Sequence, residues 1–408
     1  MNAEEIKNEE SLKAWLSARP EATRQSDAIA IAIRSALRAL PLFGSAMNEH
    51  WASETDLTAL PFLRTRLTTG VAQMFSTPEV NAVSAAATSA ARTIFASSVS
   101  LSARAAFAAA DASNMAAAVS TTDDAVTATE DAAYAAAYSA ASDASDAPYL
   151  GSSYAAASAD ANFWLQISSD AQILSRHGNT FTAPLWSTPP PDWFTKADAE
   201  TRAIWAKDPP GTWDFWIRWW DGVLSGQQLD WELQKAVALI PDEIWTQGPA
   251  AVAEAIRLIE ERLELRRQVL AMKEQLSALS TALVQQADPH HRGHNNPPEM
   301  IDASAPIILQ VNTLVAALSE AETELDQPAP DPGILRKVAG VLLDTTTAVL
   351  RYCGGLADAM LKKTAEEVGS TGVKWAIRVG GLSVVSRIEP VKDLAEQLLK
   401  FASKYFGG

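Results

Sequence analysis

The chain has 408 residues, 48% of them hydrophobic and 20% charged, and is long enough for more than one folded domain. Its net charge of −16 disfavours nucleic-acid binding, which needs basic surface to replace counterions. A single cysteine, Cys353, excludes a disulfide framework and is typical of a reducing compartment. No signal-peptide core follows the polar residues 1–10, and no apolar run reaches transmembrane length, so we expect a cytoplasmic protein.

The first 75 residues predict three helices. Apolar residues recur at helical spacing through 10–40, and Pro20 divides this stretch into two helices. We expect the second of them to end at Pro41, since proline lacks the amide that a helix interior needs. A third helix is expected from Pro61 to Phe75.

Residues 81–161 consist mostly of alanine, with serine, threonine and aspartate in most other places. Alanine has the highest helix propensity, so we expect two or three closely packed helices, with breaks near 120–122 and 147–151. No lysine or arginine occurs between Arg104 and Arg176. The stretch is therefore acidic, either as the solvated face of a bundle or as a surface for a basic partner.

Nine of the thirteen tryptophans lie between 186 and 245, among prolines that break the region into short helices. Trp213, Trp216 and Trp220 share one helical face, and with Trp219 they form a candidate aromatic cluster. Such a cluster is either a core, in which aromatic side chains supply the burial that short helices lack, or a platform for sugars or peptides.

Two long helices with heptad spacing surround residue 290. They are joined by a dozen residues that contain three prolines, so the sequence predicts an antiparallel helical hairpin. The predicted seam comprises Leu265, Val269, Met272, Leu276, Leu279 and Leu283 on the first helix, and Ile308, Val311, Val315 and Leu318 on the second. Glu322 occupies the next apolar position of that second helix.

The connecting loop carries three of the five histidines. The candidate interaction residues are His290, His291, Arg292, Gly293, His294, Asn295, Asn296, Pro297, Pro298 and Glu299. Imidazoles and a carboxylate suit zinc or nickel, so a metal site that uses His290, His291, His294 and Glu299 is the alternative to an exposed or peptide-docking loop.

Beyond the hairpin, the proline-rich residues 327–333 indicate a linker. The helix that follows should be weakened at Gly354-Gly355, and a last helix should begin at Pro390. Residues 361–408 hold eight basic and five acidic side chains. A basic amphipathic segment of this kind packs on a neighbouring helix or contacts a membrane surface, and both possibilities stay open.

Several stretches resemble a mainly alphaproteobacterial protein family with an alanine-rich region, a tryptophan-rich segment and an Arg-Gly-His-Asn-Asn-Pro-Pro-Glu motif. The matching segments are Leu12–Leu16, Ile33–Pro41, Trp216–Gly226, Ile240–Pro249 and, as the most distinctive, Arg292–Glu299. We know of no activity established for that family. The resemblance implies a modular bacterial protein whose C-terminal end varies, a pattern that suits an adaptor or effector, for example in anti-phage defence.

Together these patterns predict an all-α protein with an alanine-rich helical domain (1–180), a tryptophan-rich module (181–248), a helical hairpin (249–326) and a basic C-terminal module (327–408). No phosphate-binding loop, nucleophile elbow or zinc-protease helix is present in the sequence. We therefore expect a non-enzymatic interaction protein without cofactor or catalytic residues, which binds protein partners and forms a homo-oligomer. A metal-dependent enzyme or metal-binding protein is the alternative.

Overall fold

The structure is a computed structural model of the chain, and most of its described residues are helical. Its described residues form fourteen α-helices, two 3-10 helices and no strand, which confirms the all-α prediction. The described residues are 2–46, 59–95, 108–109, 111–112, 115, 122–145, 152–287, 301–366 and 371–404.

The chain divides into two compact units, Met1–Arg257 and Leu258–Gly408. The four regions expected from the sequence are thus grouped in pairs. The alanine-rich and tryptophan-rich regions share unit 1, and the hairpin and the C-terminal region share unit 2.

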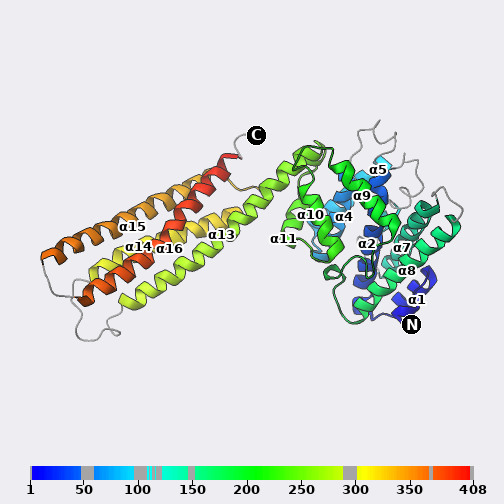
Figure 1. The fold of residues 1–408 in the computed structure, drawn as a ribbon, viewed down its shortest axis with the longest axis horizontal. Helices are drawn as coiled ribbons and strands as arrows, with labels where there is room; N and C mark the ends of the chain where they lie inside the picture. Colours follow the sequence, from blue (N-terminus) through cyan, green and yellow to red (C-terminus); the bar gives the residue numbers. More distant parts are fainter. Residues whose placement is uncertain are drawn as a thin grey trace. The chain divides into compact units, whose positions relative to one another are not determined.

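Unit 1 is organised around α2, which contacts α4, α7, α8 and α9 (Figure 1). Helices α7 and α8 also pack on each other, as α4 does on α5. The elements of this unit are η1 (Ala3–Glu5), α1 (Glu9–Ser17), α2 (Glu21–Ala46), α4 (Leu60–Met74), α5 (Pro78–Phe95), α7 (Thr122–Ser145), α8 (Ser152–Ser175), η2 (Thr180–Thr182), α9 (Asp192–Trp205), α10 (Asp214–Ser225), α11 (Trp231–Ala238) and α12 (Asp242–Trp245).

The ends of the helices in unit 1 follow local chemistry. At the start of α1, Asn8 and Ser11 cap each other: the Ser11 amide donates to Asn8 Oδ1 at 2.9 Å, and the Asn8 amide donates to Ser11 Oγ at 3.0 Å. Helix α10 ends at Gly226, whose φ of +73° is accessible to glycine without strain.

One predicted helix end in unit 1 is wrong. Helix α2 continues through Pro41 as far as Ala46. A proline removes only one helical hydrogen bond, and the burial of both Leu40 and Leu42 stabilises the helix on either side of it.

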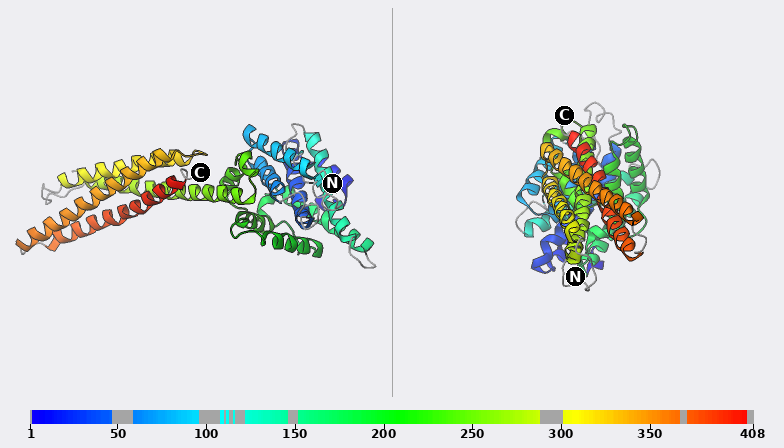
Figure 2. Two further views of the ribbon diagram at one scale, coloured as in Figure 1. Left: turned by 90° about the horizontal axis from the view of Figure 1, so that it is seen from above. Right: turned by 90° about the vertical axis from the view of Figure 1, so that its left-hand side faces the viewer.

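Unit 2 contains most of α13 (Pro249–Ala287), which begins in unit 1, together with α14 (Ile301–Leu325), α15 (Pro332–Glu366) and α16 (Thr371–Lys404). The views in Figures 1 and 2 show these long helices running side by side. One sequence expectation is corrected here: α16 begins at Thr371, and Pro390 lies in its interior. Helix α15 is continuous and includes Gly354-Gly355, where the sequence predicts a weaker helix.

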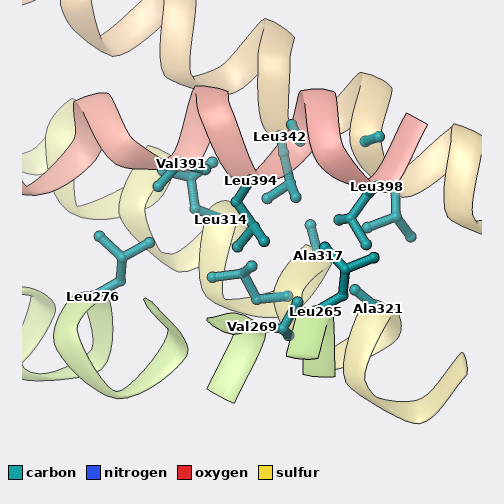
Figure 3. Packing of buried hydrophobic residues seen from close by; sticks show 14 of the residues in the cluster. Leu265, Val269, Leu276, Leu314, Ala317, Ala321, Leu342, Val391, Leu394 and Leu398 are labelled. Atoms are coloured by element: carbon teal, nitrogen blue, oxygen red, sulfur yellow. The ribbon is translucent and has the colours of Figure 1, made fainter. Parts of the chain in front are cut away.

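The core of unit 2 is aliphatic and draws on all four helices. Figure 3 shows Leu265 and Val269 of α13, Leu314 of α14, and Leu394 and Leu398 of α16 pointing toward one another. Leu342 of α15 joins the same cluster. Helices α15 and α16 therefore complete the apolar core that α13 and α14 begin. Because buried residues of α16 lie on both sides of Pro390, this proline alone does not end the helix.

Among the residues that the structure describes, no helix has an apolar stretch sufficient to span a bilayer. The structure does not describe the side chains of 354–383, which include the first half of the basic segment 361–408. Membrane contact through that segment remains a prediction.

Candidate functional site

The loop that the sequence singled out, residues 290–299, lies outside the described residues. The interaction loop and the metal site of His290, His291, His294 and Glu299 therefore stay predictions. In the described part of the chain, no three histidine, cysteine, aspartate or glutamate side chains are grouped closely enough to hold a metal ion.

The predicted hairpin seam is brought together as one core. The fully buried seam residues are Leu265, Val269, Leu276, Leu279, Val311 and Leu318, and the half-buried ones are Met272, Leu283, Ile308 and Val315. All but Ile308 belong to one apolar cluster with further residues of α14, α15 and α16, and Ile307 packs against that cluster in place of Ile308. The seam is thus closed within its own chain.

Polar contacts fix the register of α13 against α14. Lys273 pairs with Glu322, the residue that replaced an apolar one in the heptad pattern, and Ser280 Oγ donates to Asn312 Oδ1 at 2.7 Å. On the same unit, Lys404 Nζ of α16 donates to Glu261 Oε1 of α13 at 2.7 Å. Helices α13, α14 and α16 are consequently held by ion pairs as well as by apolar packing.

Cys353 lies half-buried on α15 and packs against the apolar core of unit 2. Burial raises the pKa of its thiol, because an apolar environment disfavours the thiolate. A thiol of this kind is less reactive than an exposed one.

The aromatic cluster lies in the interior of unit 1. Trp213, Trp216, Trp219 and Trp220 are between 1% and 5% exposed. Trp205 and Trp213 stack with ring centroids 5.4 Å apart, and Trp216 meets Trp219 edge to face at 5.9 Å. These rings have the offset or edge-to-face arrangements that favour burial. The core interpretation of the cluster is confirmed.

A buried indole N–H group needs a hydrogen-bond partner, and two indoles of the cluster find theirs on other helices. Trp219 Nε1 donates to Gln234 Oε1 at 3.0 Å, and Trp220 Nε1 donates to Asp198 Oδ1 at 2.7 Å. Asp198 also accepts from Arg202, which reaches Asp221 of α10 at 2.7 Å. The aromatic core and this polar network therefore depend on each other.

The most deeply buried ion pairs of the described residues join α2 to α8 and were not predicted from the sequence. Arg34 Nε and Arg38 Nη1 both lie 2.8 Å from the Asp170 carboxylate. All three side chains are at least 96% buried. Burial lowers the pKa of Arg34, whereas the charge of Asp170 opposes that shift.

The same two arginines hold the segment that leads into the tryptophan-rich region. Arg34 donates to the Thr180 carbonyl at 2.7 Å and to the Pro184 carbonyl at 2.6 Å, and Arg38 donates to the Leu185 carbonyl at 2.8 Å. This clamp explains why the two regions form one unit. Its signal in the sequence is a pair of arginines one turn apart within an apolar helical run, where an unpaired cation would be costly.

A cavity of about 20 Å³ lies between α2, α4, α10 and α11, lined in part by Ile33, Leu37, Arg66 and Trp219. Burial lowers the pKa of Arg66 to about 9, opposed by the charge of Asp111. A space of this size accommodates roughly one water molecule. It is therefore a packing defect of the core and offers no room for a substrate.

No family model, curated protein or solved structure matches this chain. The geometry of the described residues is thus the basis for a functional assignment.

Proposed function

We propose that the protein is a non-enzymatic interaction and assembly protein that associates with itself through the outer surface of the α13–α14 hairpin. The observation that carries this proposal is a pair of exposed apolar side chains near the end of the hairpin, Val284 at 52% and Leu309 at 66% exposure.

The two side chains belong to the same level of the hairpin. Ser280 and Asn312 are hydrogen-bonded across the antiparallel pair. Val284 lies four residues after Ser280 and Leu309 three residues before Asn312, so each is about one turn nearer to the connecting loop. This end of the hairpin therefore presents apolar groups outward in addition to those it buries.

The buried seam is a poor candidate for the same task. Its side chains already pack within the chain, and exposing them to a second copy would open the core of unit 2. Exposed apolar positions, by contrast, are available without unfolding, and clustered ones mark interaction surfaces. The homo-oligomer predicted from the sequence is accordingly assigned to the outward face.

Light scattering on a size-exclusion column tests this assignment. We expect the wild type to form a defined oligomer and Val284→Glu/Leu309→Glu to elute as a folded monomer of 43.6 kDa. The matched control is Gln285→Glu/Thr313→Glu, which places the same two charges at exposed positions nearby.

The control should retain the oligomer. A wild type that is monomeric at every concentration would refute self-assembly. An oligomer that survives in Val284→Glu/Leu309→Glu would instead place the interface elsewhere on the molecule.

A further inference from the structure

Helix α7 of unit 1 has a regular exposed stripe. Its members are Asp124, Thr127, Asp131, Tyr134 and Tyr138, which recur at steps of three and four residues and so occupy one face of the helix. The opposite face is buried and consists mainly of alanine. Helix α7 packs on α1, α2 and α8 and also contacts α9, and the residues of the stripe are exposed.

The two tyrosines are the unusual part of this stripe. Tyr134 is 55% exposed and Tyr138 is 47% exposed, and their rings stack with centroids 6.4 Å apart at an angle of 24°. They lie one turn apart on a helix whose other positions are mostly alanine, serine, threonine and aspartate. Large exposed aromatic groups of this kind are enriched at protein interfaces, since they contribute contact area with few rotatable bonds.

The charge of the stripe indicates what would bind there. Asp124 and Asp131 share its face, Asp123 adjoins it, and α7 itself contains no lysine or arginine. Lys13 of α1 lies at the edge, where its ammonium is 3.0 Å from Glu130. The surface therefore combines π faces with an excess of negative charge, and both attract cationic side chains.

We propose that this stripe is a docking surface for a cationic amphipathic helix of a partner protein. Spacing of three and four residues is the pattern that an approaching helix follows. Arginine or lysine side chains of the partner would lie over the two tyrosine rings and reach the two aspartates.

A second copy of the same helix does not fit this surface. In a parallel pair each aspartate of the stripe would face its equivalent, and in an antiparallel pair centred on the stripe Asp131 would face Asp131. Like charges in opposition are destabilising, and α7 has no cation of its own to neutralise them. The docking surface is consequently distinct from self-assembly through unit 2 and does not depend on it.

The test uses the full chain and a fluorescein-labelled model helix of three heptads with arginine at the a positions and leucine at the d positions. Fluorescence anisotropy gives its affinity. A peptide of identical composition, with its arginines distributed around the helix, controls for attraction to the net charge of −16. We expect the amphipathic peptide to bind and the distributed one to bind at least about tenfold more weakly.

Two surface variants and a matched control locate the binding. Tyr134→Ala/Tyr138→Ala should lower the affinity for the amphipathic peptide about fivefold to thirtyfold, because two cation–π contacts are lost. Asp131→Asn should lower the same affinity about threefold at low salt, and less at high salt because surface charges are screened. Leu165→Ala, an equally exposed apolar position on α8, should leave binding unchanged.

Equal binding of the two peptides would overturn the proposal, as would a tyrosine variant that binds like the wild type. Light scattering supplies the third possible contradiction: if Tyr134→Ala/Tyr138→Ala converts an oligomer into a monomer, the occupant of the stripe is a second copy of this chain. Circular dichroism of each variant checks that α7 remains helical, and Asp131→Asn provides the test if the tyrosine variant does not fold.

Discussion

The cores of the two units contain different kinds of side chains. Unit 2 buries leucine, valine, isoleucine, alanine and one phenylalanine in a single cluster, with its charges at the edges of the helices. Unit 1 buries indoles, arginines and an aspartate, and several of these polar groups, among them Trp219, Trp220, Arg34 and Arg38, pair with residues of other helices. Aliphatic packing needs only volume and pattern, whereas a buried polar group needs one particular partner in one geometry.

The difference predicts two kinds of sensitivity. Unit 2 should remain folded when apolar core residues are exchanged for others of similar volume, and should unfold when a charged residue is substituted into its seam. Unit 1 should lose stability when a single buried carboxylate or amide is removed, even if the replacing side chain is small enough to fit. Twelve of the thirteen tryptophans precede residue 258, all but Trp375, so intrinsic fluorescence reports mainly on unit 1.

The largest effect is expected in the seam of unit 2. Leu276→Glu/Leu279→Glu should unfold this unit, since the loss of one buried leucine costs about 2–5 kcal/mol and a buried carboxylate adds to that. Circular dichroism should show lost helicity, and limited proteolysis should cut within α13–α16.

The matched control for the seam is Ser277→Glu/Ala278→Glu, at the exposed positions between the two leucines. It should retain its helicity and its resistance to proteolysis. A seam variant that stays fully helical and merely loses an oligomer would show that the seam is an interface between chains.

The next largest effect is expected from breaking the ionic clamp of unit 1, which consists of Arg34, Arg38 and Asp170. Asp170→Ala leaves Arg34 and Arg38 buried without their carboxylate, and should destabilise unit 1 by about 3–5 kcal/mol. Urea unfolding followed by tryptophan fluorescence measures this change. Glu243→Ala, an exposed acid in the same unit, is the control and should stay within about 0.5 kcal/mol of the wild type. Equal midpoints for both variants would refute the clamp.

The smallest expected effect is a gain in stability from a substitution at the C-terminal end of α8. His177 has a φ of +56°, and the amide of Gly178 donates to the Ile173 carbonyl at 2.9 Å, as in a Schellman motif. His177→Gly should therefore raise the free energy of unfolding by about 1 kcal/mol, because glycine adopts this conformation without strain. A urea series that includes His177→Ala measures it. The alanine variant should show no such gain, and equal values for glycine and alanine would contradict the explanation.

The helices were predictable where local chemistry and periodicity agree. The heptad spacing of α13 and α14 identified ten seam residues, and all ten are buried or half-buried. Prediction failed where a local breaker opposed long-range packing, as at Pro41 and Pro390, which lie inside helices. Burial over many turns outweighs one missing hydrogen bond, and the sequence does not reveal how much burial a helix will have.

The sequence by itself determined the all-helical class, the antiparallel hairpin and the tryptophan-rich region, since these follow from propensity and periodicity along the chain. Only the tertiary structure decided that the tryptophans form a core, that Arg34 and Arg38 meet Asp170, and that Tyr134 and Tyr138 face outward while Leu276 faces inward. Which side of a helix is covered depends on other helices, whose residues lie from 15 to more than a hundred positions away, and no local pattern carries that information.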